Sequence, residues 1–294
     1  MTVAVSILPS QQLAALNETY RKAVARKRLR IALGAAVFFA ALLVASVGAE
    51  VNLRTFFTYL GNFASYFDRI LKLDNGSRVW TDIGEWLWGW RKWSFYLGET
   101  ILISYVGTVS GAVLAFGLNF LAAENTAPAP WLRIVVKRLM EICRTVPDIV
   151  FALIFVIAFG LGPMAGVLAI AIHTIGALGK QYSEMVENID MKPVEGVRCT
   201  GAGWISCMRF AVWQQVAAGF ASYTLLRFEI NVRGASVMGF VGAGGIGQEL
   251  LVAIRKFYYS DVSAILLMII LTVFVIDIGT GWIRGRLFGR GRHT

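Results

Sequence analysis

The chain has 294 residues, of which 57% are hydrophobic and only 16% are charged. Soluble globular domains average about 25% charged residues, so this composition argues against a soluble enzyme. The apolar residues form continuous blocks near the roughly 20 residues that one membrane-crossing helix needs, and backbone groups in lipid must bond within the chain. We therefore expect an all-α integral membrane protein. The net charge of +10 fits Lys and Arg on cytoplasmic loops better than it fits nucleic-acid binding.

The first 30 residues precede the first apolar block and become strongly basic toward their end. Residues 10–30 are predicted to form an amphipathic cytoplasmic helix that begins at a Ser10 cap and rests in the headgroup layer. Its apolar face is lined by Leu13, Leu16, Tyr20 and Val24. A solvated basic arm is the alternative. Because no apolar stretch precedes Ile31, we expect a retained signal anchor rather than a cleaved signal peptide.

Six apolar segments are predicted to cross the membrane. They are residues 31–48, 95–122, 141–160, 163–179, 211–232 and 261–283. Placing the N-terminus inside puts most of the 28 Lys and Arg residues on the cytoplasmic side, where the short loops of membrane proteins carry positive charge. Both termini are therefore expected in the cytoplasm, with residues 285–294 as a basic tail. Cys143, Cys199 and Cys207 then lie at or near a reducing compartment and are expected to be free thiols.

Residues 31–94 are predicted to combine the first span with a long exterior segment. Within it, Phe56, Leu60, Phe63 and Phe67 recur at helical spacing and form one apolar face. Five of the nine tryptophans follow in a short stretch: Trp80, Trp86, Trp88, Trp90 and Trp93. Trp favours the membrane interface, so this stretch is expected to anchor in the outer leaflet, with stacking against a ligand as the alternative. Residues 95–284 form the remaining core.

Residues 180–210 are a long polar link between the fourth and fifth predicted spans. A helix is expected over about 183–189, then a break near Pro193 and a second helix from about Val194. Small residues gather in and after the second helix: Gly196, Thr200, Gly201, Ala202 and Gly203. They lower helix propensity but permit close approach of another surface, so this cytoplasmic segment is predicted to dock a partner. An ordinary surface helix and turn is the alternative.

Residues 242–247 read Gly-Ala-Gly-Gly-Ile-Gly and match the G-x-G-x-x-G pattern of dinucleotide-binding sites. Such a site needs a preceding strand, a following helix and a parallel sheet, whereas this segment lies between two predicted spans. We therefore expect no cofactor here. Backbone freedom and close packing instead predict a narrow exterior gate formed by Gly242, Gly244, Gly245 and Gly247.

Several polar residues lie within or at the ends of the predicted spans, where charge is costly and usually faces protein or water. The candidates for a translocation pathway are Arg144, Asp148, His173, Arg227, Glu229, Asn231 and Arg233. Glu229 and Arg233 are four residues apart, as are Arg144 and Asp148, so each couple is expected to pair across one helical turn and hold helices together. The functional alternative is that Arg227 or Arg233 helps an anion to pass. His173 is expected to be a buried hydrogen-bonding residue.

The docking segment resembles a known motif. Glu195-Gly196-Val197 followed by Gly201 is similar to the EAA loop, E-A-A-x-x-x-G, of bacterial ABC importer permeases. In that family the loop forms a coupling helix that sits in a cleft of the ATPase subunit. The resemblance implies that Glu195, Gly196, Val197, Gly201 and Ala202 couple this chain to an ATPase. Here Gly196 and Val197 replace the two alanines, and Trp213-Gln214 stands where the family often has Leu-Pro.

Further segments resemble the phosphonate ABC transporter permease, in order over more than half of the chain. They are residues 121–125, 144–156, 175–190, 199–203, 227–251 and 275–284, of which 227–251 is the most specific. The resemblance implies the transmembrane subunit of a type I ABC importer in the plasma (inner) membrane of a bacterium. It would act as a homodimer with two ABC ATPase subunits, which bind ATP and Mg, and with an extracytoplasmic phosphonate-binding protein.

Three alternatives stay open. Phosphate, phosphite and methionine importers share this architecture and a similar glycine loop, so another small solute could be the substrate. A membrane-embedded enzyme would need a clustered metal or catalytic motif, and the sequence presents none. A passive anion channel or exporter would need no ATPase. The chain has no G-x-x-x-x-G-K-[ST] phosphate loop, which fits a permease that leaves ATP hydrolysis to a partner.

Overall fold

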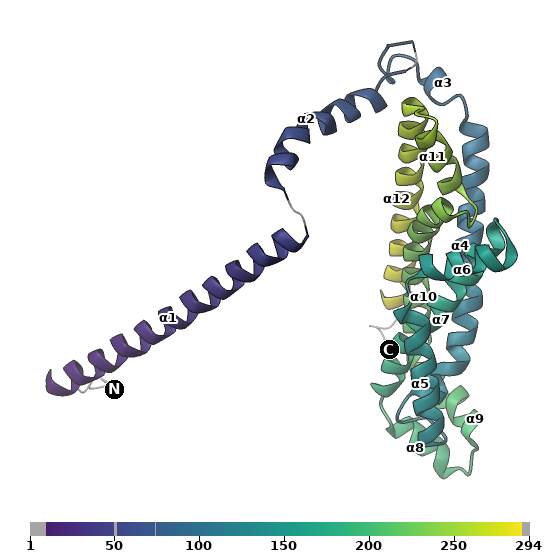
Figure 1. The fold of residues 1–294 in the computed structure, drawn as a ribbon. Helices are drawn as coiled ribbons and strands as arrows, with labels where there is room; N and C mark the ends of the chain where they lie inside the picture. The colour runs from purple at the N-terminus through teal and green to yellow at the C-terminus, as the bar shows by residue number, and fades with distance from the viewer. Residues whose placement is uncertain (1–9, 50–51, 74, 290–294) are drawn as a thin grey trace, which may run out of the picture. The chain divides into compact units, whose positions relative to one another are not determined.

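The computed structural model describes residues 10–49, 52–73 and 75–289 (Figure 1). Every regular element in these ranges is a helix, apart from one isolated β-bridge between Lys72 and Arg78. The expected all-α class is therefore confirmed. The chain divides into two compact units, residues 1–66 and 67–294.

The first unit contains α1 (Ser10–Gly48) and most of α2 (Leu53–Ile70). α1 is one continuous helix, so the basic residues before position 31 and the apolar block after it share a single axis. Its segment Asn17–Gly48 is long and apolar enough to cross a membrane. The predicted Ser10 cap and the side chains of Leu13 and Leu16 lie outside the described side chains.

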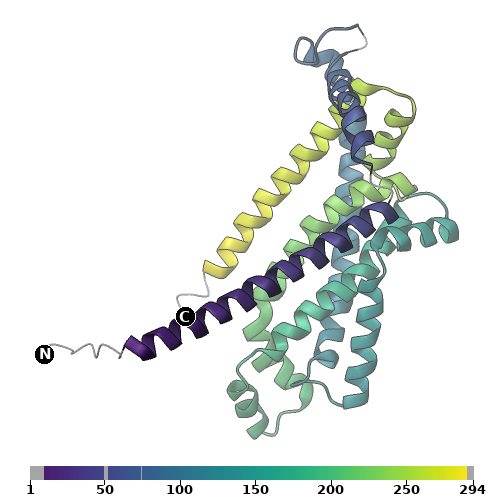
Figure 2. The same ribbon diagram turned by 60° about the vertical axis from the view of Figure 1, so that its left-hand side comes forward.

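The second unit contains the remaining helices. They are α3 (Ile83–Trp86), α4 (Trp90–Ala122), α5 (Pro130–Thr145), α6 (Asp148–Phe159), α7 (Pro163–Glu187), α8 (Lys192–Cys199), α9 (Trp204–Cys207), a π-helical turn (Met208–Val212), α10 (Trp213–Met238), a 3-10 turn (Gly239–Val241), α11 (Ile246–Arg255) and α12 (Tyr259–Gly289). Figures 1 and 2 show α4, α7 and α10 running side by side through this unit.

Within the described residues, four helical segments are long and apolar enough to cross a membrane singly, and they lie in α1, α4, α7 and α12. Two bent pairs also qualify: α5 with α6, bent by 85°, and the stretch Trp204–Val241 with α11, bent by 46°. If each bent pair is one crossing, the total is six, in agreement with the sequence prediction.

One predicted span, 141–160, is not a single helix. α5 ends at Thr145 and α6 begins at Asp148. Val146 and Pro147 between them have extended backbones, with ψ angles of 125° and 142°. Proline lacks an amide hydrogen, and its ring disfavours a helical conformation in the preceding residue, so the helix breaks here. The prediction of one continuous span was therefore wrong, and Pro147 is the physical reason.

The predicted boundaries around the cytoplasmic link also need correction. α7 continues past 179 to Glu187, so the helix expected separately at about 183–189 belongs to the same rod. The break falls at residues 188–191 rather than near Pro193, which lies in the first turn of α8. Proline is favoured there because its missing amide hydrogen would have no partner inside the helix. α10 likewise continues to Met238, past the predicted end of the fifth span at 232.

α4 and α7 form the most extensive helix pair in the described part of the chain. Gly107 of α4 lies against Ile170, and Gly111 lies against Ala171 and Thr174. A methyl group added at either glycine would come within 2.7 Å of these residues. Small residues four positions apart allow membrane helices to approach this closely, and dispersion contacts then hold them together.

A buried polar network joins α4, α7 and α10 beside this contact. Asn231 of α10 donates from Nδ2 to Thr108 Oγ1 (2.8 Å) and to Thr174 Oγ1 (3.0 Å). Ser104 Oγ lies 3.3 Å from the Asn231 carbonyl oxygen. These four side chains are each at most 3% exposed, so the network ties three helices together without access to water.

Three of the five clustered tryptophans contact other parts of the second unit. Trp93 is buried in an apolar cluster with residues of α4, α11 and α12. Trp86 Nε1 donates to Ser263 Oγ and Trp88 Nε1 donates to Asp261 Oδ1, each at 2.9 Å. Both acceptors lie near the start of α12, so this stretch fastens that end of the helix. The two remaining tryptophans of the stretch, at positions 80 and 90, are 62% and 54% exposed and keep the predicted interfacial role as an expectation.

We predict that Gly111→Ala will destabilise the folded chain by about 1–3 kcal/mol, because the added methyl group overpacks the contact between α4 and α7. Gly117→Ala in the same helix is the matched control, because no described atom beyond its own stretch of α4 lies within 4 Å of the added methyl group. Each variant is solubilised in detergent and heated, and its thermal midpoint is measured by following the folded fraction with size-exclusion chromatography. A Gly111→Ala variant as stable as Gly117→Ala would contradict the packing assigned here.

Candidate functional site

The predicted docking segment is braced on the ends of two long helices. Val194, on the inner side of α8, is fully buried in an apolar cluster with Tyr182 of α7 and Val212 before α10. The Asp190 amide donates to Gln215 Oε1 (3.0 Å), and Gln215 Nε2 donates back to the Asp190 carbonyl oxygen (3.1 Å). A displacement of α8 must therefore move α7 and α10 with it.

The outer side of the same segment is open. Of the five predicted coupling residues, Glu195, Gly196 and Gly201 are exposed, whereas Val197 and Ala202 are half-buried against the apolar cluster. Among the described residues, no other part of the chain lies within 4 Å of a methyl group added at Gly196 or Gly201. Gly201 has a φ of +80°, which explains glycine there. Packing within the chain does not explain glycine at position 196, and a bare backbone there lets another surface approach closely.

All four predicted gate glycines are buried: Gly242, Gly244 and Gly245 lie in the loop before α11, and Gly247 lies in the first turn of α11. Gly242, Gly244 and Gly245 have positive φ angles of 86°, 86° and 77°. Residues with a side chain adopt this conformation only with strain. Gly247 packs against the backbone of Gly239 and Ser236, where a methyl group would find no space. The glycines at these positions therefore serve the backbone geometry and close packing of this segment.

Hydrogen bonds hold this loop on α4 and on the turn before α7. The Gly162 amide donates to the Gly242 carbonyl oxygen (2.9 Å), and the Ile246 amide donates to Thr100 Oγ1 (2.9 Å). A methyl group added at Gly244 would lie 3.1 Å from Pro163 at the start of α7. All of these contacts lie within one chain, so a gate formed by two copies stays a prediction.

The predicted ion pair between Glu229 and Arg233 is confirmed. It belongs to a network that joins α10 to α12, because Arg284 lies 3.6 Å from the Glu229 carboxylate and Thr280 Oγ1 lies 3.5 Å from it. The Glu229 side chain is 6% exposed, whereas that of Arg233 is 55% exposed. Glu229 is therefore buried and contacts Arg233 of its own helix together with Arg284 and Thr280 of α12, so it links the two helices.

A second polar cluster lies where α6, α7 and α10 converge. Arg227 of α10 contacts His173 Nδ1 of α7. Because a guanidinium only donates, Nδ1 accepts in this contact. Asp148 interacts electrostatically with both His173 and Arg227. His173 is half-buried and hydrogen-bonded, and Arg227 Nε is buried without a partner in the described part of the chain.

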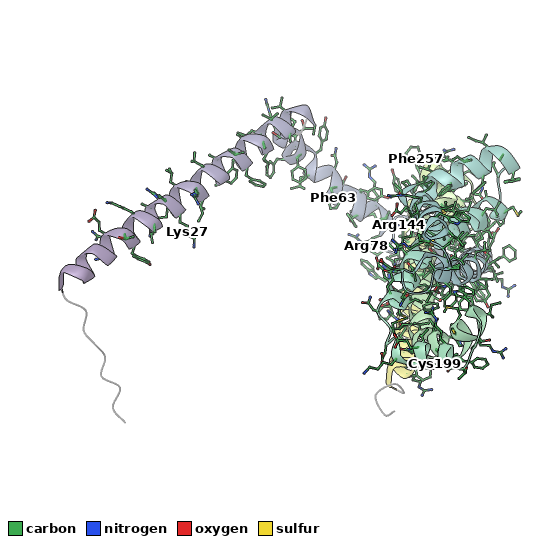
Figure 3. All side chains as sticks on the ribbon, turned by 90° about the horizontal axis from the view of Figure 1, so that it is seen from below. Lys27, Phe63, Arg78, Arg144, Cys199 and Phe257 are labelled. Carbon is green, nitrogen blue, oxygen red and sulfur yellow. The ribbon has the colours of Figure 1, made fainter. Side chains whose placement is uncertain are left out.

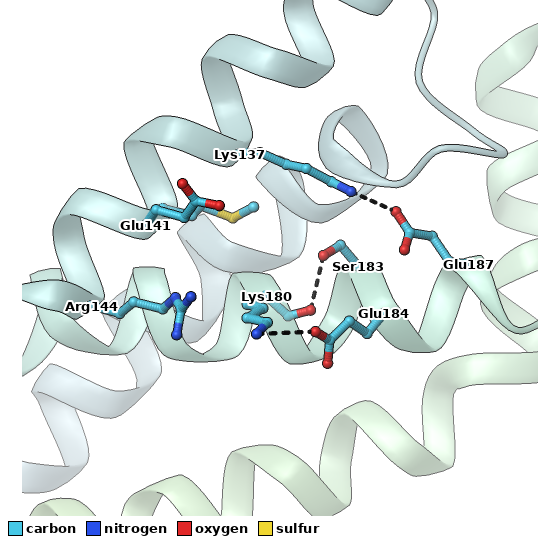
Figure 4. Close-up of a pocket in the computed structure, with 8 residues that line it drawn as sticks. Lys137, Glu141, Arg144, Lys180, Ser183, Glu184 and Glu187 are labelled. Atoms are coloured by element: carbon cyan, nitrogen blue, oxygen red, sulfur yellow. Dashed lines mark hydrogen bonds and ion pairs between the residues drawn. The ribbon is translucent and has the colours of Figure 1, made fainter.

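The predicted pair between Arg144 and Asp148 does not form among the described residues, because the break at Pro147 places the two on different helices. Arg144 instead lines a cavity of about 150 Å³ between α5 and α7 (Figure 4). The other lining residues are Lys137, Met140, Glu141, Lys180, Ser183, Glu184 and Glu187. Lys137 pairs with Glu187 (2.9 Å) and Lys180 with Glu184 (3.3 Å). Within the described chain, Arg144 is therefore the cation of this cavity that has no ion-pair partner.

Sequence reasoning missed the clamp at Asp190 and Gln215, the pair at Lys137 and Glu187, and the hydroxyl partners of Asn231. The polar face of α4 could have been predicted, because Thr100, Ser104 and Thr108 recur every four residues and share one side of the helix. The clamp and the ion pair join residues 25 and 50 positions apart, a separation at which no local pattern predicts contact.

A family model described as binding-protein-dependent transport system inner membrane component matches residues 107–290. This range contains the docking segment, the glycine loop and the polar clusters of α10. The chain is 40% identical over 196 residues to the phosphite transport system permease protein PtxC of Stutzerimonas stutzeri, an alignment that covers 67% of this chain and 71% of that relative. It is 49% identical over 110 residues, 37% of this chain and 90% of the relative, to the permease protein PhnE2 of Escherichia coli (strain K12), which is named for a cryptic phosphonate transport system.

The fold is similar to that of the MetNI methionine ABC transporter in an inward-facing conformation. The TM-score is 0.57 at 18% sequence identity, and the match covers 66% of this chain and 95% of that chain. This likeness confirms the expected type I ABC importer permease fold. Because the sequence identity is low, the comparison supports the fold and not the substrate.

We predict that Gly245→Ala will lower stability more than Gly160→Ala. Both positions have positive φ angles, 77° and 88°, so both variants carry backbone strain of about 1–3 kcal/mol. At Gly245 the added methyl group also collides with Thr100, whereas at Gly160 it meets no described residue within 4 Å. Thermal midpoints and limited proteolysis of the 242–247 loop measure the difference. Equal losses in the two variants would show that strain alone, and not packing of the loop on α4, fixes its position.

Proposed function

Because the chain belongs to the binding-protein-dependent transport system inner membrane components, we propose that it is the membrane-spanning subunit of an ATP-driven importer for phosphonates and related phosphorus oxyanions. As a permease subunit it is a transport protein and not an enzyme. The observation that carries the substrate class is its similarity to permeases named for phosphite and phosphonate transport. Phosphite or phosphate is the alternative cargo within this class. Methionine has less support, because the likeness to the methionine transporter is one of fold.

The complete importer would contain two copies of this chain, two ABC ATPase subunits that bind ATP and Mg, and an extracytoplasmic binding protein. It would lie in the inner membrane of a bacterium, with both termini in the cytoplasm. Basic residues in α5 and at the end of α12 support this orientation, because positive charge gathers on the cytoplasmic side. α8 then faces the ATPase subunits, and the glycine loop faces the exterior.

α8 is suited to act as the coupling helix. Its open outer side presents Glu195 and the bare backbone at Gly196, while Val194 fixes its inner side to the core. When ATP brings the two ATPase subunits together, α8 would move with them. The hydrogen bonds between Asp190 and Gln215 would then transmit this displacement to α7 and α10 as rigid rods.

Arg144 is the residue best placed to meet the anion. It lines a cavity, and its guanidinium has no ion-pair partner within the described chain. A guanidinium matches the oxygen geometry of phosphonate and can bind two oxygens at once. The carboxylates that share the cavity would weaken binding enough for the anion to leave, which transport requires. Arg227, with its unpartnered Nε, is the second candidate.

We expect Glu195→Lys and Gly201→Asp to lower uptake by roughly tenfold or more while the chain still inserts and folds, because each places an unmatched charge in the proposed ATPase contact. Gly76→Asp is the matched control, since Gly76 also has a positive φ, +83°, and no described neighbour within 4 Å of an added methyl group, but lies far from α8 in the sequence. ATP hydrolysis and uptake by the reconstituted transporter are measured together. Normal uptake in both α8 variants would refute the coupling role.

Proteoliposomes that contain the complete transporter and its binding protein should take up radiolabelled methylphosphonate when ATP is present. Excess phosphite should compete with this uptake, and methionine should not. Arg144→Gln should lower uptake on the order of tenfold, because one charge-assisted hydrogen bond contributes about 1.5–3 kcal/mol. Arg138→Gln, in the same helix, is the matched control, because Arg138 is 74% exposed and pairs with Glu141 at 2.5 Å.

Two outcomes would count against these assignments separately. Uptake of methionine, with none of any phosphorus oxyanion, would overturn the substrate class while leaving the importer role intact. Equal uptake by the Arg144→Gln and Arg138→Gln transporters would remove Arg144 from the pathway.

A further inference from the structure

α2 carries two separate faces along its whole length. Its apolar face consists of Phe56, Leu60, Phe63 and Phe67, with Tyr59 and Tyr66 at the margin. The first four are 60%, 48%, 63% and 47% exposed, and Figure 3 labels Phe63 among the side chains that project from the helix. Its polar face consists of Arg54, Thr58, Asn62, Ser65, Asp68 and Arg69. Such a division predicts that one face meets an apolar medium and the other meets water.

Chain connectivity ties both ends of α2 to one membrane surface. The helix begins at Leu53, five positions after Gly48, where the crossing segment of α1 ends. Five extended residues span at most about 18 Å, so the start of α2 lies near the headgroups. At its other end, Ile70 is buried with Trp93 and Leu97, which lie in the first turns of α4, where another crossing begins.

A helix of 18 residues is about 27 Å long, and both of its ends are tied to crossing segments at the same side of the membrane. This connection favours an axis that runs along the membrane surface. This surface is the one opposite α8, because α8 follows the far end of α7, at the side where α4 ends.

The chemistry of the two faces matches an interfacial position. Phe and Leu fit the boundary of the acyl chains, and tyrosines at the margin suit the headgroup level, where aromatic residues with a polar tip gather. On the polar side, the hydrogen bond from Lys72 and the nearby Arg78 guanidinium lower the pKa of the Asp68 carboxyl, which keeps it charged toward water. The polar face has few charges, so apolar burial rather than attraction to anionic lipid would hold the helix.

We propose that α2 lies flat in the membrane leaflet opposite α8, with its Phe-rich face among the lipids, as a strap between the crossings of α1 and α4. Its partner is the lipid surface itself. The strap, rather than the tryptophans that pack on α12, is then the main interfacial anchor of residues 50–94. This inference is independent of the transported solute and of the coupling role of α8.

The test places the photoreactive amino acid p-benzoylphenylalanine at Phe56 or Phe63 on the apolar face, and at Asn62 or Ser65 on the polar face as matched controls. The complete transporter is reconstituted in nanodiscs of phosphatidylethanolamine and phosphatidylglycerol and is irradiated. Mass spectrometry then identifies the adducts. Size-exclusion chromatography of the loaded nanodiscs confirms that each variant is folded and assembled, whatever its transport activity.

We expect lipid adducts from Phe56 and Phe63 at several times the yield from Asn62 and Ser65, at which water quenches the probe. Cross-links from the Phe positions to a second copy of the chain or to the binding protein would overturn the proposal in favour of a protein partner. Equal lipid yields from the two faces, or none from either, would also overturn it.

Discussion

The close approach of α4 and α7 at Gly107 and Gly111 is the contact on which the rest of the second unit depends. Lipid tails are as apolar as leucine, so the hydrophobic effect does not drive helices together in a membrane, and packing and hydrogen bonds must do so. Two glycines bring the backbones near enough for Thr108 and Thr174 to converge on a single side chain. Asn231 donates to both, and this fixes α10 against the pair.

Once α10 is fixed, the helical repeat decides what its other residues can reach. Arg227 is one turn from Asn231 and faces α7 with it, where it contacts His173. Glu229 points the other way, where it pairs with Arg233 and lies near Arg284 of α12. The helix therefore places an ion network that joins α10 to α12 on one face, and the contact with His173 of α7 on another. Charges that are equally conspicuous in the sequence thus have different partners because they lie on different faces of one helix.

The sequence predicts those features that depend on local spacing. Six apolar blocks indicated the crossings, and the spacing of four between Glu229 and Arg233 predicted their pairing, because both lie in an uninterrupted helix. The same spacing failed at Arg144 and Asp148, since Pro147 between them turns the chain by 85°. Contacts between residues far apart in the sequence could not be predicted from local spacing. Nothing local indicates that Trp86 and Trp88 bond to α12, or that Lys137 pairs with Glu187.

The break at Pro147 also limits what can surround the junction between α5 and α6. Non-helical backbone at membrane depth is tolerated only where it is buried in protein or lines a water-filled space, because lipid offers no hydrogen bonds. The Ile149 amide beside this break donates to Asp148 Oδ1 (2.9 Å), which satisfies part of that need from within the chain. The Arg144 side chain lines a polar cavity on the other side. The proline therefore does more than bend a span: by ending α5 it separates Arg144 from Asp148, so that among the described residues Arg144 lacks the ion-pair partner that a continuous helix would place one turn away.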